Sequence, residues 1–290
     1  MLIIKRAQKS ETIIELLQSY YAEITQSIGM FDEKQGVSLA HSLLDEALFN
    51  VVCGEKEPSN VLNVAALLEN AKSQQQPFLW LHHDSNIHLH QYLKKQHLES
   101  RASSYGYCFS LESTLLSFDA HPAVEMSEVA TEEQFYEWCH TFAVCHGIPV
   151  ESVEQYFRSG FGENRVFQLF TAQLYQKTIA CCAMYRKDKH AILLWDSVLP
   201  MYRRQGVGSM MVLNRLKLAK GEGLEEAFTF GANDRMQLLK KLGFKSFGKF
   251  NVLYHEPSDQ ERSDAEAQEP AESPEGESEA KSDKQQDADG

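Results

Sequence analysis

The sequence lacks the features that mark several large classes of protein. Its six cysteines form no C-x-x-C pair, and six in a chain of 290 residues make no disulfide framework, so we expect neither a zinc ribbon nor a redox dithiol. Nowhere do 18 apolar residues follow one another, and no apolar stretch follows the first positive charges. We therefore expect a reduced, cytoplasmic protein without a signal peptide or a membrane partner.

An excess of positive charge is also absent. The chain carries 28 Lys and Arg residues against 41 Asp and Glu residues, which gives a formal net charge of -13. Proteins that bind nucleic acid draw their affinity from Lys and Arg side chains that neutralise phosphates. We therefore expect no nucleic-acid partner.

Residues 257–290 lack Leu, Ile, Val, Met and every aromatic residue. This segment has 12 acidic and three basic residues, a net charge of -9, which leaves only -4 for the first 256 residues. Without apolar side chains to bury, it cannot offset the entropy cost of folding, so we expect a disordered acidic tail on a nearly neutral body. The tail is either a solubilising extension or a segment that basic partners recognise.

Residues 1–116 predict a first α/β unit. Residues 13–20 and 37–51 have the three- and four-residue apolar spacing of helices, while residues 77–81 and 105–111 are typical of strands. The unit has no glycine-rich turn and no evident site.

Residues 117–256 predict a second unit with a clearer order of elements, β-α-α-β-β-β-α-β-α-β. The elements are expected at residues 124–129, 132–143, 149–157, 165–174, 178–185, 191–198, 206–220, 227–230, 234–241 and 250–254. Three consecutive strands form an antiparallel meander that leads into the central helix. The expected fold class is therefore α/β (α+β), a mixed sheet with flanking helices.

The most specific signal lies at residues 198–209. A strand ends there, Arg203 and Arg204 follow, and Gly206 and Gly208 open a helix. Glycines let a ligand approach the backbone, and the first turn of a helix offers free N–H groups and the positive end of its dipole. Together these features predict a site for a pyrophosphate. The stretch is not a Walker loop, which requires Lys after its second glycine, and it lacks the third glycine of the dinucleotide fingerprint.

The pattern Arg203-x-x-Gly206-x-Gly208 after a strand resembles the acyl-CoA loop of the Gcn5-related N-acetyltransferase (GNAT) superfamily. The resemblance covers about residues 124–254 in the right order of elements, and Gly243-Phe244 resembles the Gly-Phe that closes the family's next motif. It implies a GNAT-like sheet and an acyl-CoA-dependent N-acetyltransferase. The N-terminal unit is similar, more weakly, to the degenerate GNAT-like half of tandem members.

The resemblance also implies which residues hold the co-substrate, acetyl-CoA. In the family, the end of the motif strand pairs with the pantetheine amides, and N–H groups of the loop hold the pyrophosphate. The matching positions here are Val198, Leu199, Arg203, Arg204, Gln205, Gly206, Val207, Gly208 and Ser209, with Asn233 beside the family's asparagine position. No metal is implied.

The catalytic residues of the family have no counterpart here. The tyrosine that protonates the departing thiolate in many members falls on Leu239, and the glutamate base of some members falls near Ile192. Neither side chain can transfer a proton. The substitutes that the sequence offers are Asp196 as base and Tyr254 as acid, and each has an alternative structural role.

Histidine- and cysteine-rich segments are expected to be structural. His88 and His90 are two residues apart, which points them away from each other on a helix, so no metal site is expected there. The pairs Cys139-His140 and Cys145-His146 are interpreted as parts of a helix that packs its cysteines inward.

We therefore expect an acyltransferase in which an amine attacks acetyl-CoA directly while both substrates are bound. The expected acceptor is an amine-bearing small molecule, a protein N-terminus or a lysine. The alternative, which Leu239 favours, is a GNAT-like module that holds CoA or a partner protein without turnover. The sequence leaves open the acceptor, the acyl chain length and the choice between monomer and homodimer.

Overall fold

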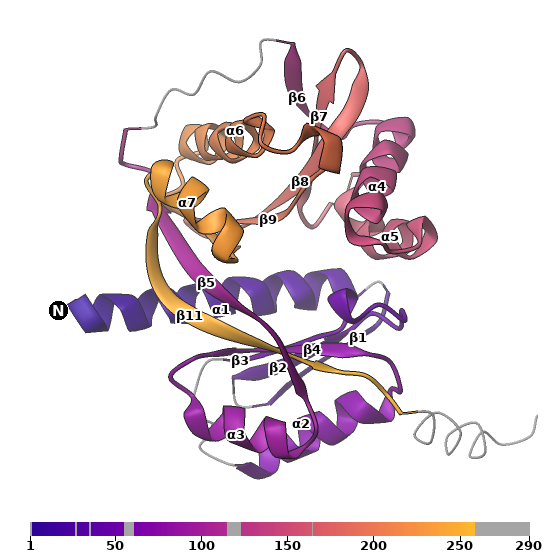
Figure 1. Ribbon diagram of the computed structural model, residues 1–290, viewed down its shortest axis with the longest axis vertical. Helices are drawn as coiled ribbons and strands as arrows, with labels where there is room; N and C mark the ends of the chain where they lie inside the picture. The colour runs from indigo at the N-terminus through magenta and orange to yellow at the C-terminus, as the bar shows by residue number, and fades with distance from the viewer. Residues whose placement is uncertain are drawn as a thin grey trace, which may run out of the picture. The chain divides into compact units, whose positions relative to one another are not determined.

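The computed structural model describes residues 2–26, 28–34, 36–54, 61–114, 123–163 and 165–258, with the backbone alone at residues 2–4, 61–63, 233 and 234 (Figure 1). The described chain up to Pro257 forms one unit. The expected boundary at residue 116 lies outside the described residues, as does the acidic tail from residue 259 onward.

Eleven strands of the described chain join into one sheet, in the order β1-β2-β3-β4-β11-β5-β10-β9-β8-β7-β6. The N-terminal half supplies β1 (Met30–Lys34), β2 (Val37–His41), β3 (Val51–Gly54), β4 (Phe78–His83) and β5 (Glu99–Ser110). The C-terminal half supplies β6 (Val124–Glu128), β7 (Gln168–Leu174), β8 (Lys177–Lys187), β9 (His190–Val198), β10 (Glu226–Gly231) and β11 (Lys245–His255). The pairs β3–β4 and β9–β10 are parallel, and the other described pairs are antiparallel.

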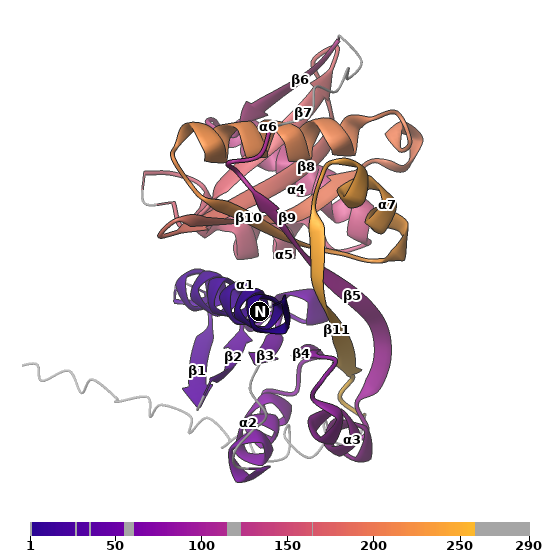
Figure 2. The same ribbon diagram turned by 90° about the vertical axis from the view of Figure 1, so that its left-hand side faces the viewer.

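Helices cover both faces of this sheet. They are α1 (Leu2–Thr25), α2 (Val61–Ser73), α3 (Ile87–Lys95), α4 (Glu132–His146), α5 (Val150–Phe157), α6 (Val207–Gly221) and α7 (Asn233–Lys241). In the C-terminal half, α4 and α5 lie on one face, and α6 and α7 lie on the other (Figures 1 and 2). The helix α1 packs between the strands of the two halves, since it contacts β11, β1, β2 and β3 as well as β8 and β9.

The two halves exchange their last strands. Strand β11 follows α7 but lies between β4 and β5, while β5 of the N-terminal half pairs with β10. These two strands also pair with each other and run together from one half to the other (Figure 1). Otherwise each half repeats one order: three antiparallel strands, a helix, a parallel strand and a second helix. Neither half therefore completes its sheet alone.

The structure confirms the expected order of elements in the C-terminal half, because a described helix or strand lies on each of the expected segments. The helix expected at residues 37–51 is wrong. That segment contains β2, a short 3-10 turn (Ala47–Phe49) and the start of β3. Every residue of β2 is buried, so the strand lacks the alternation of apolar and polar residues that identifies a half-exposed strand.

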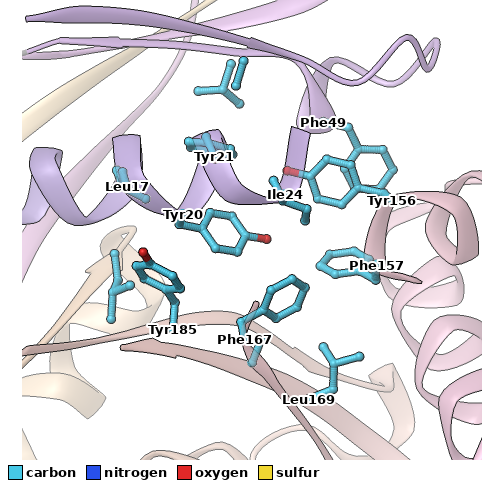
Figure 3. Close-up of a cluster of buried hydrophobic side chains, with 14 of the residues drawn as sticks. Leu17, Tyr20, Tyr21, Ile24, Phe49, Tyr156, Phe157, Phe167, Leu169 and Tyr185 are labelled. Atoms are coloured by element: carbon cyan, nitrogen blue, oxygen red, sulfur yellow. The ribbon is translucent and has the colours of Figure 1, made fainter. Parts of the chain in front are cut away.

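The two halves share an aromatic core around α1. Figure 3 shows Tyr20 of this helix among side chains from α5, β8 and the start of β7. The Tyr20 ring makes edge contacts with Phe167 and Tyr185, with ring centroids 5.3 and 5.7 Å apart. Its hydroxyl accepts a hydrogen bond from Trp195 Nε1 at 2.9 Å. Because burying one such ring contributes about 1.5–3 kcal/mol, this cluster fixes α1 against both halves.

A buried ion cluster holds the helices on the other face of the C-terminal half. Asp196 of β9 forms salt bridges with Arg215 of α6 and Arg235 of α7. The Arg215 side chain is fully buried and also donates to the backbone oxygens of Ala183, at 2.7 Å, and Met211, at 3.2 Å. The shared carboxylate thus ties both helices to β9.

We expect the two halves to unfold in one transition, because they share strands and α1. Trp80 lies in the core of the N-terminal half and Trp138 in that of the C-terminal half, and both are fully buried. Two variants, each with a single tryptophan, separate the signals. One retains Trp80 and the other Trp138, with the remaining tryptophans replaced by Phe, so the fluorescence of each variant reports on one half. Urea midpoints from fluorescence and circular dichroism should coincide within each variant. Separate midpoints would show that the halves unfold independently.

Asp196→Asn should destabilise the fold, because it leaves two guanidinium groups without their counter-charge. Removing one partner of a buried ion pair costs about 3–5 kcal/mol. Asp188→Asn makes the same change in the exposed turn between β8 and β9, where the effect should stay within about 0.5 kcal/mol. Urea denaturation measures both variants, and equal midpoints would contradict a stabilising role for the cluster.

Candidate functional site

Strands β9 and β10 run side by side and then part. They pair from His190 opposite Glu226 to Leu193 opposite Thr229, and β9 continues to Val198. Residues 194–198 therefore have no partner strand on that side in the described chain, so an extended ligand can pair with this edge through backbone hydrogen bonds. We call this point of separation the fork.

A bulge on the opposite edge of β9 directs the side chains at the fork. Trp195 and Asp196 together lie opposite a single residue of β8. Trp195 adopts a φ of +61°, in the left-handed region that side chains disfavour at a cost of order 1–3 kcal/mol. As a result, Asp196 faces α6 and α7, whereas Ser197 contacts α4.

The loop after β9 folds back onto the end of that strand. The chain passes through a 3-10 turn (Pro200–Tyr202) and enters α6 at Gly206. The φ of Gly206 is +85°, which glycine adopts readily and other residues do not. Arg203 Nε donates to the backbone oxygen of Val198 at 2.9 Å, which holds the loop beside the fork.

The first turn of α6 is open to an anionic ligand. The N-cap residue, Gly206, has no side chain to accept a hydrogen bond from the first turn. The first N–H groups of the helix, at the positive end of its dipole, can therefore donate to a ligand. A Cβ built on Gly208 would come no closer than 3.9 Å, to Leu238 Cδ2. The protein itself therefore leaves room at Gly208, which a ligand close to the backbone would fill. Arg203 and Arg204 are exposed beside this turn, so the geometry fits a pyrophosphate.

The remaining loop residues support this turn. Val207 and Ser209 are buried beneath it, and Gln205 Nε2 donates to the backbone oxygen of Met201 at 3.0 Å. Val198 is half-buried at the end of β9. The structure thus brings the predicted loop and the end of the motif strand together at one place.

The start of α7 bears on two expectations. Asn233 is the first residue of the helix, but its side chain lies outside the described residues, so its contact with a cofactor stays a prediction. Leu239 is fully buried, and a Cβ added to Gly231 would lie 2.8 Å from its Cδ1. Leu239 therefore fills the core where many family members have a tyrosine.

The structure does not favour Asp196 as the base. Salt bridges to Arg215 and Arg235 engage both of its carboxylate oxygens, and its side chain is only 8% exposed. The lone pairs are directed at guanidinium N–H groups rather than at a substrate. Its place is the ion cluster between β9 and the helices α6 and α7.

The expectation for Tyr254 is also corrected. Gly231 at the end of β10 lies level with Tyr105 of β5, which in turn lies level with Lys249 of β11. Tyr254 is farther along β11 by five residues, about 17 Å at the rise of a strand, and it lies among the strands of the N-terminal half. The guanidinium of Arg101 covers its ring at 4.2 Å. This position is too far from the fork for Tyr254 to protonate a thiolate there.

A polar pair that the sequence did not predict lies beside the fork. His146, the last residue of α4, places its Nε2 2.9 Å from Ser197 Oγ. Ser197 is buried, whereas His146 is an exposed residue whose ring stacks on Phe142 with ring centroids 4.2 Å apart. Burial and the charge of Arg203 both lower the pKa of His146. Only the fold brings α4 to the end of β9, so no local sequence signal identifies this pair.

The histidine-rich segment forms its own contacts in the N-terminal half. His82 Nε2 lies 3.2 Å from His90 Nδ1, and burial lowers the pKa of His82. The part of the chain that the structure describes contains no group of three His, Cys, Asp or Glu side chains arranged to hold a metal ion. Among the described helices, none has the length and apolar character needed to cross a membrane.

A separate cavity of about 1140 Å³ lies between the end of α1 and α5. Its described lining includes Glu23, Glu151, Glu154 and Glu163, with Arg158 as the cation. The loop residues at 198–209 do not line it. This cavity is therefore not part of the fork.

The model of the acetyltransferase (GNAT) family matches residues 128–244. No curated protein matches the sequence.

Solved structures with a similar fold cover both halves of the chain. A GCN5-related N-acetyltransferase from Kribbella flavida is 12% identical, with a TM-score of 0.65 over 86% of this chain and 96% of its own. A GCN5-related N-acetyltransferase from Sphaerobacter thermophilus is 11% identical, with a TM-score of 0.57 over 78% of this chain and 82% of its own. A tandem GNAT protein from the clavulanic acid biosynthesis pathway is 11% identical, with a TM-score of 0.52 over 77% and 79%.

At these identities the structural likenesses establish the fold, while the family match covers the part of the chain that carries the loop. The chain therefore has the GNAT fold, and its C-terminal half is a domain of the acetyltransferase (GNAT) family.

Proposed function

We propose that this protein is an N-acyltransferase that moves the acetyl group of acetyl-CoA to an amine while both substrates are bound. The observation that carries the proposal is the fork of β9 and β10, which leads directly into the open first turn of α6. The free edge of β9 can pair with the extended pantetheine arm of CoA, and the first turn of α6 can bind its pyrophosphate. The two features follow each other along the chain, as the two parts do in CoA.

In this proposal the backbone does most of the binding. The N–H groups of the first turn of α6 hold the pyrophosphate, with Arg203 and Arg204 supplying positive charge from its flank. The pantetheine arm pairs with the edge of β9 at residues 194–198. A strand N–H near Val198 polarises the thioester carbonyl and stabilises the oxygen as charge develops on it. Acetyl-CoA supplies the activated acyl group, and the protein supplies position and a fixed dipole.

The acceptor is expected to reach the thioester from the α4 side of β9. The opposite side is filled by the ion cluster of Asp196, Arg215 and Arg235, whereas His146 on the α4 side is an exposed residue. The acceptor class that we propose remains an amine, on a small molecule, a protein N-terminus or a lysine, in the cytoplasm.

A second candidate function is a module that binds CoA without turnover. The observation that favours it is Leu239, which is buried where many family members place their tyrosine. Sustained release of CoA from acetyl-CoA in the presence of amine mixtures separates the two candidates, since a binding module releases none.

Gly208→Asp should weaken the binding of acetyl-CoA, CoA and 3′,5′-ADP by about 100-fold or more, which is ~2.8 kcal/mol. The new carboxylate would occupy the space of the pyrophosphate and repel its charge. The fold should persist, because an acidic residue in the first turn of a helix suits the helix dipole. Calorimetric titration measures the three affinities, and urea denaturation measures the stability.

Gly208→Ala is the matched control, since its methyl group meets only Leu238 at an ordinary contact distance of 3.9 Å. Its methyl group is small and uncharged, so we expect it to weaken binding far less than Gly208→Asp does. Gly206 is a poorer test because its φ of +85° strains any other residue. If Gly208→Asp bound acetyl-CoA as tightly as the wild type, the loop would not be the phosphate site.

A further inference from the structure

The imidazole of His146 stands at the fork, on the side from which an acceptor can approach. It ends α4, and its Nε2 lies 2.9 Å from Oγ of Ser197. Ser197 immediately precedes Val198, the last residue of the motif strand, within the edge that lacks a partner strand. A side chain held against this residue lies beside the backbone at which the proposed reaction takes place.

The hydrogen bonds around Ser197 fix the orientation of this ring. In the tautomer with its proton on Nε2, His146 donates to Ser197 Oγ, and the Ser197 hydroxyl donates to the backbone oxygen of Trp195 at 3.3 Å. In the neutral imidazole the lone pair then lies on Nδ1. Phe142 supports the ring by stacking, and His146 as a whole is an exposed residue at the end of α4.

The surroundings of His146 keep it neutral. Burial of part of the ring lowers its pKa, and the charge of Arg203, on the loop that follows β9, lowers the pKa further. On its own helix the neighbouring titratable group is Cys145, whose thiol pKa is raised, mainly by burial. A neutral imidazole at pH 7 is ready to accept a proton, which is the condition for a general base.

We propose that His146 accepts the proton of the acceptor amine, with Ser197 as its positioning residue. This inference rests on the proposed acetyl transfer. The amine nitrogen forms a bond to the thioester carbon, the C–S bond breaks, and the amine proton passes to His146 Nδ1. The CoA thiolate then takes that proton from the imidazolium, so the ring returns to its neutral state.

This assignment fits the other residues at the fork. Asp196 is engaged by two arginines, the Leu239 side chain has no proton that it can transfer, and Tyr254 lies among the strands of the N-terminal half. One imidazole that first accepts and then returns a proton replaces both the tyrosine and the glutamate, which have no counterpart in this sequence.

Chemical modification of the wild-type protein tests the position of His146 without requiring an acceptor. Diethyl pyrocarbonate acylates neutral, accessible imidazoles, and mass spectrometry locates the modified residues. Saturating acetyl-CoA should slow the modification of His146 by at least 10-fold and leave His140 unchanged, since His140 is exposed on the same helix. Equal rates with and without bound acetyl-CoA, or an unreactive His146, would overturn the proposal.

The role in proton transfer is tested with His146→Gln, with His140→Gln as the matched control. The acceptor probe is methoxyamine, which stays unprotonated across the range used, so the pH profile reports on the protein. Wild-type CoA release should rise with pH through the lowered pKa of His146, below about 6.5, and then level off. His146→Gln should be at least ~100-fold slower and lose this inflection, with its affinity for acetyl-CoA unchanged. A His146→Gln variant with the wild-type rate and profile would overturn the role.

Ser197→Ala provides a second variant that leaves His146 in place. It should lower kcat with little change in KM, and adding it to His146→Gln should cause no further loss, because the two residues act as one unit. Additive losses would overturn the positioning role. If the wild-type protein binds no acetyl-CoA by calorimetry, the proposed function itself fails. Binding without protection of His146 overturns the present inference alone.

Discussion

Strands β5 and β11 cross between the two halves, and β5 pairs with the strand that forms one side of the fork. Strand β10 can part from β9 because β5 pairs with its other edge along the whole length of β10. Strand β11 then holds β5 in place and continues beside β4. Without this support β10 would be a short strand paired on one edge only, at four of its six residues. The N-terminal half thus helps to keep the fork open. It has no such fork between its own parallel strands, because β3 pairs with β4 along its whole length.

The bulge at Trp195 gives β9 two functions. On one side Asp196 meets two arginines and closes the sheet against α6 and α7. On the other side Ser197 meets the end of α4, where a polar ring remains exposed. The strained residue is anchored by its hydrogen bond to Tyr20 of α1, so a helix from the first residues of the chain stabilises the geometry at the fork.

How much of this could be predicted depends on the distance over which each signal acts. The loop at 203–209 was readable because its arginines and glycines are consecutive and act through local backbone geometry. The C-terminal helices and strands could be predicted because their apolar residues recur at the spacing that places them on one face of a helix or strand. By contrast, β2 is buried on both faces and has no alternation to read. The places of Tyr254 and His146 depend on which strands pair and which helix ends meet, and pairing between distant segments leaves no local pattern.

The exchanged strands also set the order in which the chain can fold during synthesis. Strand β4 is complete by residue 83, but its neighbour β11 consists of residues 245–255. Contacts between segments this far apart close long loops and form slowly. The N-terminal half therefore carries an open sheet edge through most of translation, and α1 lacks its contacts with β8 and β9 until residue 198 has been synthesised. During that interval chaperone binding and aggregation at the open edge compete with completion of the sheet.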